Sequence, residues 1–126
     1  MEHSLEHLIE TARRIRRHLV NMSHSGKAPH LGSALSTVEI LVSLYWELAN
    51  ISPETANHPN RDRVILSKGH AAAALYATLA ERGIIPISQL ATYAKPRSSL
   101  PEQMSPKCIP GVEAATGSLG HGLPMG

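Results

Sequence analysis

The stretch DRVILSKGHAAAALYA, residues 62–77, constrains the fold of this chain more than any other. Val64, Ile65 and Leu66 are the β-branched and aliphatic residues typical of a short buried strand. The alanine-rich run of residues 71–80 consists of strong helix formers. The stretch therefore predicts a strand that leads into a helix through a Lys-Gly-His corner.

This corner has the features of a ligand site. Gly69 allows the backbone to turn or to approach a ligand closely. His70 follows it at the expected helix start, where unpaired backbone N–H groups favour anions such as phosphate. The same residues also suit an ordinary connection between a strand and a helix, and a Gly-His pair alone favours that simpler interpretation.

The composition indicates one soluble domain, or part of one, and gives little information on its partner. The chain has 126 residues and a formal charge of +2, which is too mild to indicate a nucleic-acid partner. Cys108 is the sole cysteine, so an intrachain disulfide and a zinc site built on several cysteines are excluded. Neither a signal peptide nor an apolar stretch of membrane-spanning length is visible in the sequence. We therefore expect a cytoplasmic protein without membrane or nucleic-acid contacts.

Helical periodicity is clearest near the N-terminus. Apolar residues recur there at spacings of three and four, which predicts a long amphipathic helix that Gly26 and Pro29 end; the stripe consists of Leu5, Leu8, Ile9, Ala12, Ile15, Leu19 and Met22. Its polar face carries several arginines. We interpret this face as solvated rather than as a patch for nucleic acid or lipid.

Several shorter elements follow. Ser36 and Glu39 have the spacing of a capping box and predict a second helix over residues 37–49. The helix after His70 is expected to end at Gly83 in a left-handed cap, and Ser88 is expected to cap a short helix that reaches Tyr93. Residues 50–61 and the proline-rich residues 95–110 are expected to be loops. A loop as long as residues 95–110 within a compact domain is usually either functional or poorly ordered.

Two more histidines lie in segments that contain glycines. His30 follows the first helix, and His121 lies in the glycine-rich turn of residues 116–126. Each motif alone is a weak signal. The glycine spacing around His121 matches neither the dinucleotide fingerprint nor a P-loop, and a flexible tail or an incidental role explains it slightly better than chemistry does. The segment around His30 could likewise be an ordinary loop. His3 and His7 share a helix face at metal-ligand spacing, but no third ligand is evident, so no metal site is predicted.

Taken together and in order, three segments resemble the N-terminal region of transketolases, thiamin diphosphate enzymes that transfer two-carbon ketol units. These segments are SGKAPHLGSALSTVEIL, DRVILSKGHAAAALYATLAERG and PGVEAATGSLGHGLPMG. The resemblance extends from the first helix to Gly126 and is greatest to bacterial enzymes divided between two polypeptides. It implies the α/β class, with residues 1–126 an incomplete, helix-rich N-terminal portion of a Rossmann-like, three-layer α/β/α domain that binds thiamin diphosphate.

The resemblance also implies roles for individual residues. His30 would be a catalytic residue that contacts the substrate near the reactive carbon of the cofactor and helps to move protons. His70 would contact the cofactor diphosphate, in agreement with its expected position at a helix start. Gly117 and Leu119 would line the thiamin rings, with Ser118 at the variable place between them. The cofactor would supply the chemistry that breaks and forms the C–C bond.

The family pattern is only partly present. Transketolases hold Mg²⁺ and the diphosphate with a downstream Gly-Asp-Gly segment and an asparagine, and a glutamate from a separate domain activates the cofactor. We therefore expect these groups to lie outside this chain, which would work in an obligate oligomer with a C-terminal subunit or the remainder of the enzyme and would be inactive alone. The alternative is a non-catalytic remnant or interaction protein that keeps the family surface without the cofactor.

Two departures concern the substrate. Many relatives carry Gly-His-Pro just before Pro-Gly-Val-Glu, whereas residues 100–106 here read LPEQMSP. The turn reads Leu-Gly-His-Gly where Leu-Gly-Gln-Gly is commoner. His121 is therefore a candidate substrate-binding residue that compensates for the missing histidine, and the donor and acceptor could differ from the usual sugar phosphates.

Overall fold

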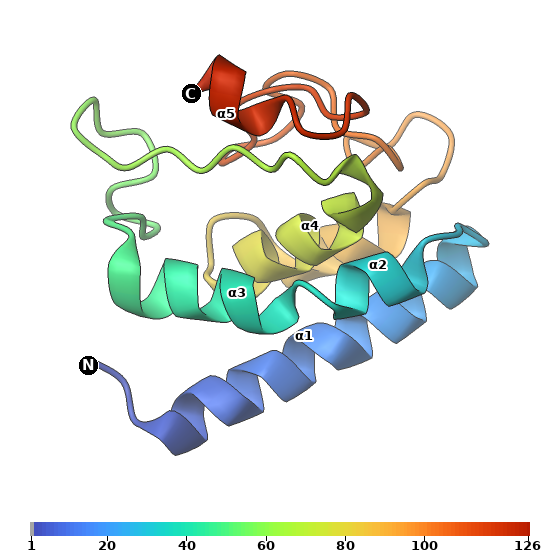
Figure 1. Ribbon diagram of the computed structural model, residues 1–126. Coiled ribbons are helices and arrows are strands. Elements are labelled where there is room, and N and C mark those ends of the chain that lie inside the picture. The colour runs from blue at the N-terminus through green and yellow to red at the C-terminus, as the bar shows by residue number, and fades with distance from the viewer. Residues whose placement is uncertain (1) are drawn as a thin grey trace.

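Helices form one layer of the molecule, and an irregular C-terminal segment forms a second layer across them (Figure 1). The computed structural model describes residues 2–126. Its α-helices and helical turns are α1 (Leu5–Gly26), α2 (Leu31–Leu35), α3 (Val38–Ser43), the π-helical turn η1 (Leu44–Leu48), the 3₁₀ turn η2 (Gly69–Ala71), α4 (Ala72–Glu81), the 3₁₀ helix η3 (Ile87–Thr92) and α5 (Gly122–Met125). No helix among the described residues is long and apolar enough to cross a membrane.

The long N-terminal helix is confirmed as α1. It begins at a cap in which the Ser4 hydroxyl accepts a hydrogen bond from the backbone N–H of His7, and it ends at Lys27 in the left-handed conformation, with φ of 49°. One face of α1 is buried against the other helices by Thr11, Ala12, Ile15, Leu19 and Met22. The apolar stripe that predicted the helix is thus largely the face that packs.

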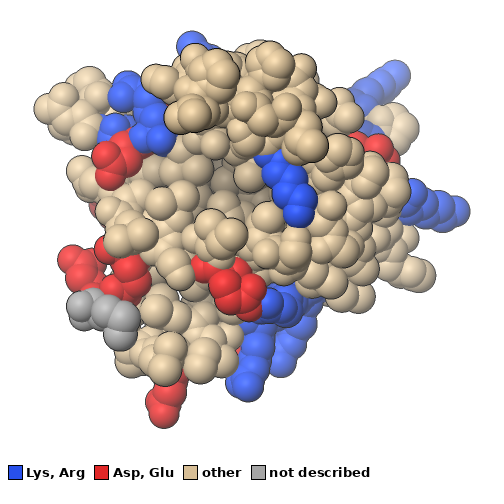
Figure 2. All heavy atoms as spheres, viewed as in Figure 1, with Lys and Arg blue, Asp and Glu red and all other residues tan. Residues whose placement is uncertain are grey.

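The polar face of α1 is occupied by ion pairs. Arg13 and Arg17 both lie near Glu10, at 3.5 and 3.9 Å, and Arg16 pairs with Glu39 of α3. In the view of Figure 2, a group of basic side chains lies at the lower side of the molecule with acidic side chains close to it. Arginines already paired with carboxylates favour the interpretation of a solvated face over a nucleic-acid patch.

The predicted second helix is present, but its predicted cap is wrong. Residues 38–48 are helical as α3 and η1, whereas Ser36 is the C-terminal cap residue of the preceding short helix α2. Its hydroxyl donates a hydrogen bond backward to the carbonyl of Ser33, at 2.9 Å. Thr37 is the residue before α3, and Glu39 reaches Arg16 instead of the helix start. The capping box does not form because both side chains have other partners.

The alanine-rich helix α4 lies at the centre of the fold. Its buried residues include Leu75, Tyr76 and Leu79, each at most 1% exposed, and it packs against both α1 and α3. Small alanine side chains allow neighbouring helices to approach closely around it. The expected left-handed ending is confirmed, because Gly83 has φ of +83°.

The strand predicted over Val64, Ile65 and Leu66 is not formed as part of a sheet. Residues 62–68 run as an extended stretch between the helical layer and the C-terminal layer, and no strand pairing is present within residues 2–126 (Figure 1). The three apolar side chains are half-buried. Composition indicates a preference for extended backbone, but a sheet also requires a neighbouring strand to complete the hydrogen bonds.

The proline-rich loop of residues 95–110 is confirmed as irregular, and it is firmly anchored. Leu100 and Met104 are buried in the core, and the Tyr76 hydroxyl donates a hydrogen bond to the carbonyl of Pro101 at 2.8 Å. The preceding short helix is the 3₁₀ helix η3, which begins at Ile87 after Pro86. Ser88 therefore lies inside this helix and does not cap it.

Candidate functional site

Two of the histidines selected from the sequence lie in contact. The rings of His30 and His70 have centroids 4.7 Å apart and planes at 82°, so that the edge of one meets the face of the other. His30 is the residue before α2, and His70 lies in η2, the turn that leads into α4. Both are exposed, and together they line a small cavity with Leu19, Ser23, Pro29, Leu31, Ala34, Ala73 and Tyr93. The prediction that His70 lies near a helix start is confirmed.

His30 has an unusual backbone conformation. Its φ of 75° is in the left-handed region, which few residues other than glycine adopt. The carbonyl of His30 accepts a hydrogen bond from the backbone N–H of Ala34, at 3.1 Å, which starts α2. Just before it, the Ser23 hydroxyl of α1 donates to the carbonyl of Ala28, at 3.0 Å. Contacts on both sides thus hold His30 in a conformation that local preference disfavours.

Gly69 brings the Lys-Gly-His corner against the glycine-rich turn. A Cβ atom at Gly69 would lie 2.8 Å from the backbone nitrogen of Gly117 and 3.0 Å from Cβ of Thr116. Two residues earlier, the Ser67 hydroxyl accepts a hydrogen bond from the backbone N–H of Gly122, at 2.6 Å. The close approach expected at Gly69 is therefore made to another part of the same chain.

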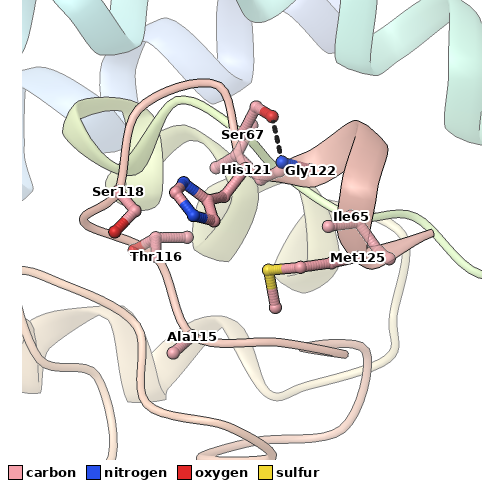
Figure 3. Close-up of a pocket in the computed structure, with 9 residues that line it drawn as sticks. Ile65, Ser67, Ala115, Thr116, Ser118, His121, Gly122 and Met125 are labelled. Atoms are coloured by element: carbon pink, nitrogen blue, oxygen red, sulfur yellow. Dashed lines mark hydrogen bonds between the residues drawn. The ribbon is translucent and has the colours of Figure 1, made fainter.

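A second cavity lies where the extended stretch meets the C-terminal layer. It has a volume of about 160 Å³, and its walls are formed by Ile65, Leu66, Ser67, Ala115, Thr116, Ser118, His121, Gly122 and Met125. Figure 3 shows the His121 ring turned into this cavity, toward Thr116 and Ser118. His121 therefore lines a different cavity from the one that His30 and His70 share.

The residues proposed to face the thiamin rings lie at the surface. Gly117 and Ser118 are exposed, and the Leu119 side chain is 71% exposed. The turn depends on glycine at two positions, because Gly117 and Gly120 have φ of +123° and +86°. A large apolar side chain exposed beside two flexible backbone positions is available for contact with a ligand or another polypeptide.

Two residues near the paired histidines were not selected from the sequence. Tyr93 lines their cavity from the end of η3, and burial, assisted by the charge of Glu102, raises the pKa of its phenol, which keeps the hydroxyl protonated. Lys68 extends its ammonium group to α2, where it contacts the Ser33 carbonyl at 3.1 Å and the Ser36 hydroxyl at 2.9 Å. No local pattern indicates either role, because both contacts join residues far apart in the sequence.

His3 and His7 lie side by side at the N-terminal end of α1. Their rings stack with centroids 5.1 Å apart, and His3 Nδ1 lies 3.1 Å from a carboxylate oxygen of Glu47. Within residues 2–126, no group of three or more His, Cys, Asp or Glu side chains could hold a metal ion.

Comparison with known proteins identifies the family. Residues 5–126 match the family described as the thiamine diphosphate-binding domain of transketolase. The chain is 45% identical over 123 residues to an apulose-4-phosphate transketolase subunit from Actinobacillus succinogenes, covering 97% of this chain and 45% of that protein. It is 44% identical over 94 residues to the 6-deoxy-6-sulfo-D-fructose transketolase subunit SqwG of a Clostridium species, covering 75% of this chain and 34% of that protein.

A solved structure agrees with this result. The transketolase from Leishmania mexicana superposes with a TM-score of 0.85 at 27% identity, covering 92% of this chain and 18% of that one. The chain thus spans less than half the length of these relatives. Its sequence and its helix-rich fold together show that the chain belongs to the transketolase family and has the fold of the N-terminal part of the thiamine diphosphate-binding domain.

Proposed function

We propose that this chain supplies one wall of the cofactor and substrate site of a transketolase-like enzyme, which transfers a two-carbon ketol unit from a ketose phosphate to an aldose phosphate. The observation that carries the proposal is the 4.7 Å ring contact between His30 and His70. It occurs where the Lys-Gly-His corner meets the glycine-rich turn, so that three separate segments of the sequence converge.

The residues at this junction fit one side of thiamin diphosphate. His70 is exposed at the start of the helical run that continues into α4, where an imidazole and the first backbone N–H groups suit a phosphate. The exposed Gly117, Ser118 and Leu119 offer backbone and apolar surface of the kind that an aromatic ring requires. Mg²⁺ and the activating glutamate of the family are proposed to be held by residues outside this chain.

The positions of these residues indicate separate roles for the cofactor, His70 and His30. Bound thiamin diphosphate would supply the electron sink that allows the ketose C–C bond to break. His70 would hold the diphosphate. His30, in contact with His70, would orient a substrate hydroxyl and move its proton, since an imidazole can both accept and donate one.

His121 is proposed to bind the substrate from the second cavity. Its ring faces the hydroxyl-bearing side chains of Thr116 and Ser118 (Figure 3). A group of imidazole and hydroxyl side chains can hydrogen-bond the hydroxyls of a sugar. This arrangement supports the prediction that His121 compensates for the histidine of the Gly-His-Pro segment, which the chain lacks.

The chain is further proposed to function as the N-terminal piece of a larger assembly. Two of its relatives are named as transketolase subunits, and this chain covers 45% of the first of them. We propose that residues 1–126 are an incomplete portion of the domain, that a C-terminal subunit or the remainder of the enzyme completes the site in an obligate oligomer, and that the chain alone does not turn over.

A chimera tests this function directly. Residues of this chain would replace the matching region of the Actinobacillus protein, where the two are 45% identical, and the product would be combined with the remaining polypeptide of that enzyme. Calorimetry with Mg²⁺ would measure the thiamin diphosphate affinity, and ketol transfer from apulose 4-phosphate would measure turnover.

His70→Ala is expected to raise the cofactor Kd about tenfold or more, because a charge-assisted contact with the diphosphate is lost. His30→Ala is expected to lower kcat about 100-fold while the cofactor Kd changes less than about threefold, as for loss of a general acid or base. His24→Ala, which alters an exposed histidine in the last turn of α1, is the matched control and should leave both values unchanged.

Three results would contradict the proposal or part of it. If the folded chimera bound no cofactor and transferred no ketol unit, the non-catalytic alternative would hold instead. If His30→Ala and His70→Ala both matched an active parent, the roles assigned to these two histidines would be wrong. Ketol transfer by the purified chain on its own would refute the claim that the chain is inactive alone.

A further inference from the structure

Lys68 joins the two short elements that carry His30 and His70. Its ammonium group donates hydrogen bonds to the carbonyl of Ser33, at 3.1 Å, and to the hydroxyl of Ser36, at 2.9 Å. Ser33 lies in α2, which begins immediately after His30, and Lys68 is the residue before η2, which contains His70. One side chain thus links both histidine-bearing elements.

The contact is well suited to fix α2 in place. A helix of five residues gains too little from its own hydrogen bonds to hold its position, so tertiary contacts must do so. The Ser33 carbonyl is near the C-terminal end of α2, where the partial negative charge of a helix favours a cation. The Ser36 hydroxyl also donates to this carbonyl, at 2.9 Å. The ammonium group, the carbonyl and the hydroxyl are thus each hydrogen-bonded to the other two.

Lys68 donates two hydrogen bonds that join residues 31–36 to residues 67–71. Within residues 2–126, no other side-chain hydrogen bond connects these two segments. The ring contact of His30 with His70 lies beside these hydrogen bonds, and α2 also packs against η2 and α4. The geometry of the histidine pair therefore depends on Lys68 more than on any other polar contact.

We propose that Lys68 is a positioning residue, which holds α2 against the corner so that His30 and His70 keep their ring contact. The inference rests on the function proposed above, because it assigns these two histidines to the same site. It predicts that loss of the ammonium group lets His30 move relative to His70. Proton transfer by His30 should then suffer before cofactor binding by His70 does.

The first test does not depend on activity. Nuclear magnetic resonance spectra of the chain labelled at histidine would be assigned with His30→Gln and His70→Gln. In Lys68→Met, the ring resonances of both histidines should shift or broaden, whereas those of His3 should not. Lys68→Arg should restore them in part, because it keeps a charged donor, and Lys95→Met, which removes an exposed lysine, should leave every ring resonance unchanged. Ring resonances of His30 and His70 that match the parent in Lys68→Met would overturn the inference.

The second test uses the chimera. Lys68→Met should lower kcat about tenfold while the thiamin diphosphate Kd changes less than about threefold, since a small displacement of a catalytic group is costly. Ser36→Ala removes one of the two acceptors of Lys68 and should lower kcat by a smaller factor. It replaces Lys68→Met in this test if Lys68→Met does not fold. A Kd that rises as much as kcat falls would show instead that Lys68 contacts the diphosphate itself. The parallel His30→Ala and His70→Ala measurements separate the two proposals, because an effect of both without an effect of Lys68→Met overturns only this inference.

Discussion

At the scale of single residues, Gly69 shows how tightly the corner and the turn are joined. The space for its side chain is filled by the backbone nitrogen of Gly117, 2.8 Å from an ideal Cβ position. A neighbouring backbone atom cannot move aside as a flexible side chain can. Any larger residue at this position must therefore push the glycine-rich turn away from the histidine pair.

Gly69→Ala is expected to lower the free energy of unfolding by about 1–3 kcal/mol, as for overpacking at a closely packed site. Urea unfolding of the chain would measure the change. Gly32→Ala is the matched control, because nothing lies within 4 Å of a Cβ there and the residue is in α2. Alanine in a helix should stabilise the control by up to about 1 kcal/mol. Equal effects of the two substitutions would contradict the close packing at Gly69.

The sequence allowed His30 and His70 to be selected as site candidates, but their mutual contact could not be predicted from it. Each lies in a recognisable glycine-flanked motif, and the motifs occur in the order of the transketolase family. The contact itself depends on where α2 and η2 settle in three dimensions. The hydrogen bond between Ser67 and Gly122 could not be predicted either, because it joins residues separated by 55 positions. Their functional roles stay predictions.

At the scale of elements, a buried carboxylate fastens α1 to α4. The Glu81 side chain is only 8% exposed and receives Arg14 Nε at 2.9 Å and His18 Nε2 at 2.7 Å. Both partners come from consecutive turns of α1. Removing one member of such a partly buried set leaves the others without compensation, which costs more than loss of an exposed ion pair.

Glu81→Gln is expected to destabilise the chain by about 1–3 kcal/mol, because an amide cannot balance the charge of Arg14. Glu10→Gln, in α1, is the control. Its carboxylate is 44% exposed and its arginine partners are 3.5 and 3.9 Å away, so a loss below about 0.5 kcal/mol is expected. Guanidinium unfolding would distinguish these values, and a larger loss for Glu10→Gln would refute the account of the Glu81 contacts.

Sequence patterns predicted the helices better than their ends or the strand. The apolar periodicity of α1 and the alanine content of α4 are properties of the segments themselves. The cap at Ser36 failed because that hydroxyl bonds Ser33, and the strand at residues 62–68 failed because pairing requires a second strand. Local sequence therefore indicates a preference for helix or strand, whereas contacts with other residues determine which caps and strand pairs form.

At the scale of the whole molecule, large apolar side chains remain exposed on both layers. Ile40 and Leu48 are 67% and 76% exposed on the helical layer, and Leu119 and Leu123 are 71% and 90% exposed on the C-terminal layer. Exposed apolar surface on two sides is typical of a polypeptide that contacts other protein surface. This feature supports the proposal that the chain works within an assembly.

We therefore expect the purified chain to self-associate. Sedimentation velocity at increasing concentration should show species larger than a monomer, because exposed apolar surface favours association. Leu123→Ser, at the most exposed of these side chains, should reduce the larger species. Thr92→Ser, which alters an exposed polar residue, is the control. A single monomeric species at all concentrations would contradict the expectation.

The central claim is that His30, His70 and the glycine-rich turn form one wall of the thiamin diphosphate site. The most direct measurement is the distance from the His70 ring to the cofactor diphosphate in a crystal structure of the assembled enzyme with thiamin diphosphate and Mg²⁺. The account predicts a hydrogen bond, at about 2.7–3.2 Å, with the thiamin rings against residues 117–119. A bound cofactor whose diphosphate contacts neither His70 nor the start of η2 would contradict it.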